Sequence, residues 1–84
     1  MNNITNKPTL DMHGMDREYG KLALLEFIND HKKMKTKEIV IVHGIGKGIL
    51  RDMVLDTLRH NKDVLEYHID YFNSGSTIVK LKID

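Results

Sequence analysis

The stretch Glu38-Ile39-Val40-Ile41-Val42-His43-Gly44-Ile45-Gly46-Lys47-Gly48 decides the fold of this 84-residue chain. Residues 39–42 are apolar and β-branched at every position, a pattern typical of a central strand with little water on either side. Three glycines at alternate positions then end this strand, and apolar residues recur at helical spacing from residue 49 to about residue 60. The stretch therefore predicts a buried strand that a glycine-rich loop joins to a helix.

Similar patterns on either side predict the order β-α-β-α-β-β. The expected elements are strand 9–13, helix 17–33, strand 38–42, helix 49–60, strand 65–71 and strand 77–83. Asp16 is expected to cap the first helix, and residues 73–76 are expected to turn the last two strands into a hairpin. The predicted fold class is α/β in the broad sense, and its architecture is an α+β two-layer sandwich with a four-stranded mixed sheet. Its two helices cover one face of the sheet and leave the other face open to solvent.

Length and composition narrow the class of protein. At roughly 100–200 residues per domain, the chain forms one small domain, with a flexible tail over residues 1–7 and the domain over residues 8–84. It has no cysteine, which excludes disulfides, thiolate metal sites and a cysteine nucleophile. The sequence shows neither an apolar run long enough to span a membrane nor the apolar stretch of a secretory signal, so we expect no membrane association and a cytoplasmic location.

The charges are distributed unevenly along the chain. The net charge is +1, yet lysine and arginine prevail in residues 32–51 whereas acidic residues prevail in residues 52–72. Such polarity can steer an anionic ligand to one end of a nearly neutral protein. A solvated surface without a ligand is the alternative interpretation.

Two polar motifs are expected to meet at one edge of the sheet. The first strand ends in Asp11-Met12-His13-Gly14, and the second is followed by His43 and the glycines. Carboxyl ends of neighbouring parallel strands share an edge, and ligands bind there because helix N-termini point the same way. The two motifs are therefore predicted to form one site.

Asp11 and His13 are two residues apart, so both side chains project to the same face of the strand. Leu10 and Met12 project to the opposite face, where the helices lie, so the carboxylate and the imidazole are expected on the open side. A histidine transfers protons near neutral pH, and a neighbouring carboxylate can orient its ring. The alternative is a strand-end aspartate that binds turn amides beside an exposed histidine.

The glycine-rich loop predicts an anion site. Backbone N–H groups of Gly44, Gly46 and Gly48 can converge on a phosphate, and the following helix N-terminus adds its positive dipole end. Lys47 and Arg51 would add mobile positive charge. The spacing matches neither a P-loop nor a dinucleotide fingerprint, and a tight turn without a ligand remains the alternative.

Two further residues join these candidates. Arg17, at the start of the first predicted helix, is a candidate phosphate-binding residue. His43, directly after the second strand, is a candidate second proton carrier or a hydrogen-bond donor to a phosphate oxygen.

The other histidines and the aromatic residues are weaker candidates. His31 and His60 fall near helix C-termini, where a cation is favoured, and are interpreted as structural. His68 is expected on the solvent-exposed face of the third strand, where it can line the open surface.

Among the aromatic residues, Tyr67 and Tyr71 share a face with apolar neighbours and are expected in the core. Tyr19 and Phe72 are weak candidates for stacking on a nucleic-acid base.

Three motifs together resemble the Smr (small MutS-related) domain family. They are Leu10-Asp11-Met12-His13-Gly14, the segment from Val42 to Arg51, and Gly75-Ser76-Thr77-Ile78-Val79-Lys80-Leu81. The resemblance covers about residues 8–84 and implies a stand-alone member of the family. It also implies a fold similar to the C-terminal domain of a bacterial initiation factor. In that fold the last strand lies antiparallel between the second and the third, giving the order 1-2-4-3.

The resemblance also implies a function. Family members are DNA-nicking or RNA-cleaving endonucleases, some of which act on messages at stalled ribosomes. The Asp-x-His motif, here Asp11 and His13, is tied to cleavage, and the Gly-x-Gly loop, here Gly44 and Gly46, to nucleic-acid binding. The expected partner is therefore RNA or DNA, with ribosome association as an option, and the protein is expected to act as a monomer.

We therefore expect phosphodiester cleavage, with RNA as the favoured substrate, in which His13 is the acid and base and Asp11 orients it or accepts a proton. No obligatory cofactor or metal is expected, because the predicted edge offers one clear carboxylate where two-metal nucleases need several. A mechanism that uses a single divalent cation with Asp11 as its ligand remains an alternative. The alternative functions are a non-catalytic nucleic-acid or ribosome-binding module and a binder of small anions or nucleotides.

Overall fold

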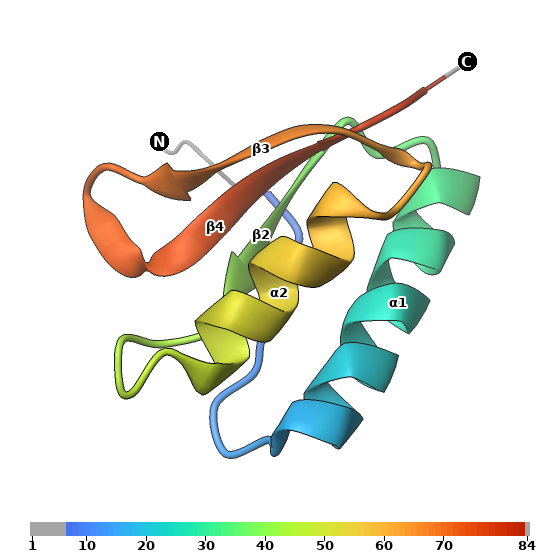
Figure 1. Ribbon diagram of the computed structural model, residues 1–84. Coiled ribbons are helices and arrows are strands. Elements are labelled where there is room, and N and C mark those ends of the chain that lie inside the picture. Colours follow the sequence, from blue (N-terminus) through green and yellow to red (C-terminus); the bar gives the residue numbers. More distant parts are fainter. Residues whose placement is uncertain (1–6, 84) are drawn as a thin grey trace.

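The computed structural model describes residues 7–83, and these residues form one sheet with two helices packed on the same face (Figure 1). Along the chain the elements are β1 (Thr9–Asp11), α1 (Arg17–Lys33), β2 (Glu38–Val42), α2 (Ile49–Arg59), β3 (Val64–Asp70) and β4 (Asn73–Leu81). The predicted element order and the two-layer fold class are confirmed.

The sheet is mixed, and its strand order is β1-β2-β4-β3. β1 pairs parallel with β2, and β4 lies antiparallel between β2 and β3. The order expected from the family resemblance is therefore confirmed. β2 is a central strand, as its continuous apolar run predicts.

The core lies between the sheet and the two helices. Alternate residues of the central strands point toward the helices and are buried, so that the period of two seen in the sequence becomes one apolar layer. The fully or nearly fully buried apolar side chains are Met12, Leu24, Ile28, Ile39, Ile41, Met53, Val54, Leu58, Val79 and Leu81. Gly20 of α1 lets this layer close, because a Cβ atom there would lie 2.8 Å from Cε of Met12.

The other face of the sheet is uncovered. Val40, Val42 and Ile78 are half-buried there, and charged side chains lie among them. Nζ of Lys80 lies 3.0 Å from Oε2 of Glu66, and this hydrogen-bonded carboxylate raises the pKa of Lys80 above its usual value. The pair is solvent-exposed, so it adds little to stability.

The β3–β4 hairpin differs from the predicted one. The turn consists of Tyr71 and Phe72, not of residues 73–76, because Asp70 pairs with Asn73 and β4 begins there. Asp70 stabilises the turn through its side chain, whose Oδ1 accepts the backbone N–H of Phe72 at 3.0 Å. An aspartate that bonds its own backbone two residues on is a common turn-forming device.

The prediction that Tyr71 lies in the core is therefore wrong. Tyr71 is 94% exposed because it stands in the turn, whereas Tyr67 is half-buried against the core as predicted. Leu65, expected beside them, is exposed because the register shifts between Val64 and Glu66. A register shift of one residue turns a side chain to the other face of the sheet.

Of the predicted tail over residues 1–7, residues 1–6 lie outside the described part of the chain. Lys7 is half-buried, and its Nζ lies 3.4 Å from Oε1 of Glu38. Within residues 7–83, neither helix has the length and apolar character that crossing a membrane requires.

Replacement of Ile41 tests the position of the core. Ile41→Ala leaves a cavity beneath the helices and is expected to lower the free energy of unfolding by about 2–5 kcal/mol. Ile45→Ala is the matched control, because Ile45 is 65% exposed and its loss is expected to change stability by no more than about 0.5 kcal/mol. Urea denaturation followed by circular dichroism measures both, and equal losses would contradict the described core.

Candidate functional site

The chain leaves β1 through a tight turn that turns two polar side chains outward. The N–H of Met12 still donates to the carbonyl of Val42 at 2.9 Å, and the N–H of Met15 donates to the carbonyl of Met12 at 3.0 Å. Gly14 takes φ 82°, which a glycine at this turn position adopts without strain. Met12 is fully buried, whereas Asp11 and His13 are exposed, as the spacing predicts.

Asp11 and His13 are joined through the backbone. Oδ1 of Asp11 accepts the backbone N–H of His13 at 2.9 Å. Within residues 7–83, the carboxylate makes this contact and no hydrogen bond to the imidazole of His13. The pair is therefore adjacent, with its aspartate bonded to a turn amide and its ring free to meet a ligand.

The glycine-rich loop uses left-handed backbone at all three predicted positions. Gly44, Gly46 and Gly48 have φ values of 84°, 25° and 85°. Gly48 is also the N-cap of α2, and no side chain caps this helix. By contrast, Asp16 caps α1, because its carboxylate accepts the N–H of Tyr19 at 2.8 Å. The first N–H groups of α2 are therefore available to an anion.

Two cationic residues lie at this loop. Arg51 folds back over Gly48, where a Cβ atom would lie 2.5 Å from Nη2 of the guanidinium, and the left-handed backbone of Gly48 at φ 85° favours glycine there. Nε of Arg51 also lies 3.5 Å from Oδ1 of Asp52. Lys47 is exposed at the turn of the loop.

One pocket of about 530 Å³ unites these elements. It is lined by Asp11, His13 and Gly14 from the end of β1 and by every residue from 42 to 51. Asp11 is the only acidic residue that lines it within the described part of the chain. The structure thus brings together two motifs that are thirty residues apart, as the parallel pairing of β1 with β2 requires.

Arg17 is a candidate phosphate-binding residue that does not line this pocket. It begins α1, and its Nη1 lies 2.9 Å from Oε2 of Glu18. Its guanidinium is thus paired with a neighbour on the same helix.

His43 lines the pocket but is only 6% exposed, and both of its ring nitrogens have protein partners. Nδ1 lies 2.9 Å from the carbonyl oxygen of Gly44, and Nε2 lies 2.9 Å from Oγ1 of Thr77. A carbonyl only accepts, so Nδ1 carries a proton and donates it to Gly44, and Nε2 shares its hydrogen bond with the hydroxyl of Thr77. The imidazole thus fixes the first residue of the glycine loop to β4.

Gly75 is a supporting residue of the site, although the sequence pattern predicts it in a turn. Its carbonyl accepts the N–H groups of both His43 and Gly44, each at 2.9 Å. A Cβ atom at position 75 would lie 3.2 Å from Cα of Gly44, so the two strands meet here without side chains. The alternating pattern likewise predicts Thr77 as one residue of the last strand, without a role at the site. A polar residue on the buried face of that strand was the available signal.

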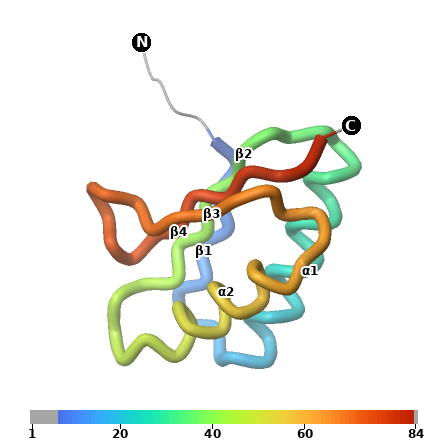
Figure 2. Tube along the Cα trace, turned by 45° about the horizontal axis from the view of Figure 1, so that its top comes forward, coloured from blue at the N-terminus to red at the C-terminus, as the bar shows by residue number. Residues whose placement is uncertain are grey.

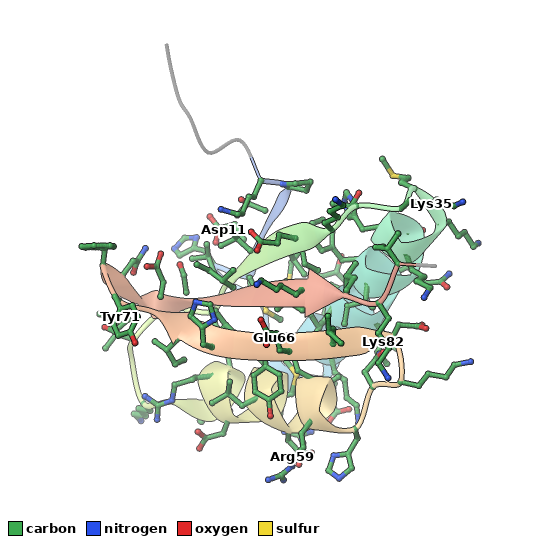
Figure 3. All side chains as sticks on the ribbon, turned by 90° about the horizontal axis from the view of Figure 1, so that it is seen from above. Asp11, Lys35, Arg59, Glu66, Tyr71 and Lys82 are labelled. Atoms are coloured by element: carbon green, nitrogen blue, oxygen red, sulfur yellow. The ribbon has the colours of Figure 1, made fainter. Side chains whose placement is uncertain are left out.

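The remaining histidines and the basic connector lie away from the pocket. Nδ1 of His31 lies 2.9 Å from Oγ1 of Thr36, and Nδ1 of His60 lies 2.9 Å from the carbonyl oxygen of Asp56. The lysine-rich connector after α1 precedes β2, at the opposite end from the glycine loop. Lys35 accordingly lies far from Tyr71 in Figure 3. The basic stretch predicted from the sequence is therefore divided between two ends of the molecule.

The strand order and the pocket define a small α/β domain whose pocket lies at the carboxyl ends of β1 and β2. The Smr domain family matches residues 10–82, and the chain belongs to this family. The match spans both edge motifs and the hairpin.

Relatives and solved structures agree with this assignment. The chain is 37% identical over 79 residues to "Endonuclease MutS2" of Lactococcus lactis and 40% identical over 76 residues to the protein of that name from Streptococcus mutans. These alignments cover 90% and 87% of this chain but only 10% of each relative.

Two crystal structures share the fold at 22% sequence identity, each with a TM-score of 0.86. One is the Smr domain of Thermus thermophilus MutS2, of which 98% is covered together with 89% of this chain. The other is YdaL, a stand-alone small MutS-related protein from Escherichia coli, of which 66% is covered together with 93% of this chain.

Replacement of Thr77 tests how His43 is held. Thr77→Val keeps the volume but leaves Nε2 of His43 buried without a partner, and we expect a loss of about 1–2 kcal/mol in unfolding free energy. Thr9→Val is the control, because Thr9 is exposed and water replaces its hydrogen bond to the carbonyl of Lys7. Chemical denaturation compares the two, and equal stability of both variants would contradict the described hydrogen bond.

Proposed function

We propose that this protein is a nucleic-acid-binding endonuclease that cleaves phosphodiester bonds, with RNA favoured over DNA. The observation that supports it most is the shared pocket of the Asp11–His13 pair and the glycine-rich loop at an uncapped helix N-terminus. Relatives with 37–40% identity bear the name endonuclease, but the chain spans only about a tenth of their length. The activity is therefore proposed for this domain on the chemistry of its own residues.

In this proposal a backbone phosphate binds at the start of α2. The N–H groups of the first turn and the loop amides donate to its oxygens, and the helix dipole favours the negative charge. Lys47 and Arg51 line the same pocket and neutralise the phosphate. These contacts read the backbone and not the bases, so they bind any sequence.

His13 lines the same pocket, and in this proposal it acts as the acid and base. On RNA the ribose 2′-hydroxyl loses its proton to a base, its oxygen attacks phosphorus, and the bond from phosphorus to the 5′-oxygen breaks. That oxygen takes a proton as it leaves, so the products are a 2′,3′-cyclic phosphate and a 5′-hydroxyl. His13 supplies one or both proton transfers, and Asp11 orients it or accepts a proton.

His43 acts as a positioning residue in this scheme. Both ring nitrogens are engaged by Gly44 and Thr77, which favours a role in holding the loop over a role as a second proton carrier. The route through the 2′-hydroxyl needs an acid and a base and no metal ion. Because only RNA has this hydroxyl, RNA is the favoured substrate. For the same reason a metal-free mechanism is favoured over one in which Asp11 binds a divalent cation.

The proposal includes a setting for this activity. We place the protein in the cytoplasm as a monomer that acts on RNA, with ribosome-bound RNA as one form of the substrate. Among residues 7–83 no three metal-binding side chains cluster, so Asp11 would need water or the substrate phosphate to complete a metal site.

Replacement of His13 tests the catalytic assignment. His13→Ala is expected to lower the cleavage rate of labelled single-stranded RNA by at least about a hundredfold, because the acid and base is lost. His60→Ala is the matched control, since this exposed histidine bonds the backbone at the end of α2 and does not line the pocket. The assay is run with and without a chelator, and a substrate with 2′-deoxyribose throughout is expected to resist cleavage.

Two outcomes decide between the functions. Equal cleavage by wild type and His13→Ala would remove His13 from the mechanism. If neither protein cleaves at any pH yet both bind the RNA, the domain is a binding module and the endonuclease proposal is wrong.

Replacement of Lys47 tests the phosphate site separately from catalysis. Lys47→Ala is expected to weaken binding of single-stranded RNA and to reduce the slope of log affinity against log salt by about 0.7, because one phosphate contact is lost. Lys37→Ala removes an exposed lysine at the opposite end of β2 and is expected to leave the slope unchanged. Fluorescence anisotropy over a salt series measures both slopes, and equal slopes for the two variants would argue against the loop as the phosphate site.

A further inference from the structure

Two aromatic side chains stand in solvent at the tip of the β3–β4 hairpin. Tyr71 is 94% exposed and Phe72 is 97% exposed, the two highest exposures among the large apolar residues of the described chain. They are the whole of the two-residue turn between Asp70 and Asn73. Large rings are normally half or fully buried, so two adjacent ones in water call for a binding role.

The turn itself does not need these rings. Two-residue hairpin turns favour glycine, asparagine and aspartate, not aromatic residues. Here a flanking residue supplies the hydrogen bond that stabilises the turn, since Oδ1 of Asp70 accepts the N–H of Phe72. The aromatic side chains therefore contribute neither to the core nor to the turn.

The hairpin tip lies beside the pocket of the candidate site. Gly75, three residues after Phe72, bonds the backbone of His43 and Gly44 at the start of the glycine-rich loop. In both Figure 1 and Figure 2 the hairpin tip and this loop leave the sheet on the same side. Asp11, Val42 and Ser76 are direct pairing partners across β1, β2 and β4, so the Asp11 side of the pocket lies about 10 Å from β4 at the usual strand spacing.

A groove connects the rings with the uncovered face of the sheet. It has a volume of about 430 Å³, and Tyr71 and Phe72 form one wall of it. Its remaining lining includes the apolar side chains of Val40 and Ile78 and the exposed ring of His68, all from the uncovered face. Lys7, Thr9 and Asp70 complete the lining, so the groove combines flat aromatic and apolar surfaces, which suit the face of a planar ring, with a few polar groups.

We propose that Tyr71 and Phe72 stack on unpaired bases of the nucleic acid whose phosphate occupies the glycine-rich pocket, so that the substrate is single-stranded at this point. The inference rests on the proposed function and deepens it by naming the form of the substrate. Aromatic side chains bind bases through their π-faces, whatever the sequence. In a duplex these faces are covered by neighbouring bases, so only unpaired nucleotides can use the hairpin tip.

The position of the groove favours nucleic acid over a protein partner. A strand whose phosphate is held by Lys47 and the start of α2 continues along the same edge of the sheet toward the hairpin. In this arrangement the bases of that strand face the aromatic wall of the groove. A second copy of this chain docking through the same rings is the competing occupant, and the test below includes it.

The double variant Tyr71→Ala/Phe72→Ala tests the proposal. Its binding to a fluorescein-labelled single-stranded RNA is measured by anisotropy, with a 2′-O-methyl backbone that prevents cleavage during the measurement. We expect the affinity to fall about tenfold or more, because base stacking is lost. A strand of the same length with abasic sites at its central positions carries the same phosphates but lacks the bases. We expect the double variant to bind this strand with an affinity within about twofold of that of the wild-type protein.

Two matched variants control for general effects. The swap Tyr71→Phe/Phe72→Tyr keeps both rings and is expected to bind as wild type. Met34→Ala removes an exposed apolar side chain just after α1, at the opposite end of the molecule, and is also expected to bind as wild type. Because both rings are exposed, the double alanine variant is expected to keep the wild-type melting temperature, which circular dichroism checks.

Each other outcome overturns the inference in a recognisable way. If the double alanine variant binds the single strand as wild type while Lys47→Ala binds it weakly, the stacking role is wrong and the proposed function stands. If the double variant binds a duplex and the abasic strand as weakly, relative to the wild-type protein, as it binds the base-bearing single strand, base recognition is wrong. If it abolishes self-association in sedimentation equilibrium and leaves RNA affinity unchanged, the rings bind a second copy. If wild type binds none of these strands, the proposed function fails together with the inference.

Discussion

The carbonyl of Gly75 accepts the N–H groups of both His43 and Gly44, and the geometry of the candidate site depends on this junction. It joins the first residues of the glycine-rich loop to the start of β4, which has entered the sheet between β2 and β3. The imidazole of His43 adds a second connection through Thr77. A Cβ atom at position 75 would lie 3.2 Å from Cα of Gly44, so the glycine at position 75 lets the hairpin approach the backbone of the loop closely.

The half-covered sheet explains why the site forms at this edge. Two helices bury one face, and every second residue of β2 and β4 faces them. The chain must therefore turn from strand to helix at the carboxyl ends of β1 and β2, which lie side by side. One of these turns presents Asp11 and His13, and the other presents the N-terminus of α2. The two motifs meet because of the parallel pairing, which the hydrogen bond from the N–H of Met12 to the carbonyl of Val42 extends beyond β1.

Much of this architecture could be predicted from residue patterns, and the errors have physical causes. Period and β-branching identified all six elements, but neither determines which strands are neighbours, and the strand order came from the family resemblance. The sequence Asn73-Ser74-Gly75 looks like a turn, yet its glycine serves the close approach to Gly44, and the turn falls on two aromatic residues instead. The burial of His43 was within reach, because it continues the inward-facing series of Ile39 and Ile41.

The two helix starts differ in a way that links stability to the proposed function. Asp16 caps α1, whereas α2 begins at Gly48 without a side-chain cap, which forgoes a few tenths of a kcal/mol of helix stability. The exposed rings of Tyr71 and Phe72 likewise stabilise nothing within the described chain. Proteins depart from local rules of stability mainly where they bind or react. Because both departures occur at one edge of the sheet, and Asp11 and His13 lie at that edge too, a single ligand that carries both a phosphate and a planar base accounts for all three features.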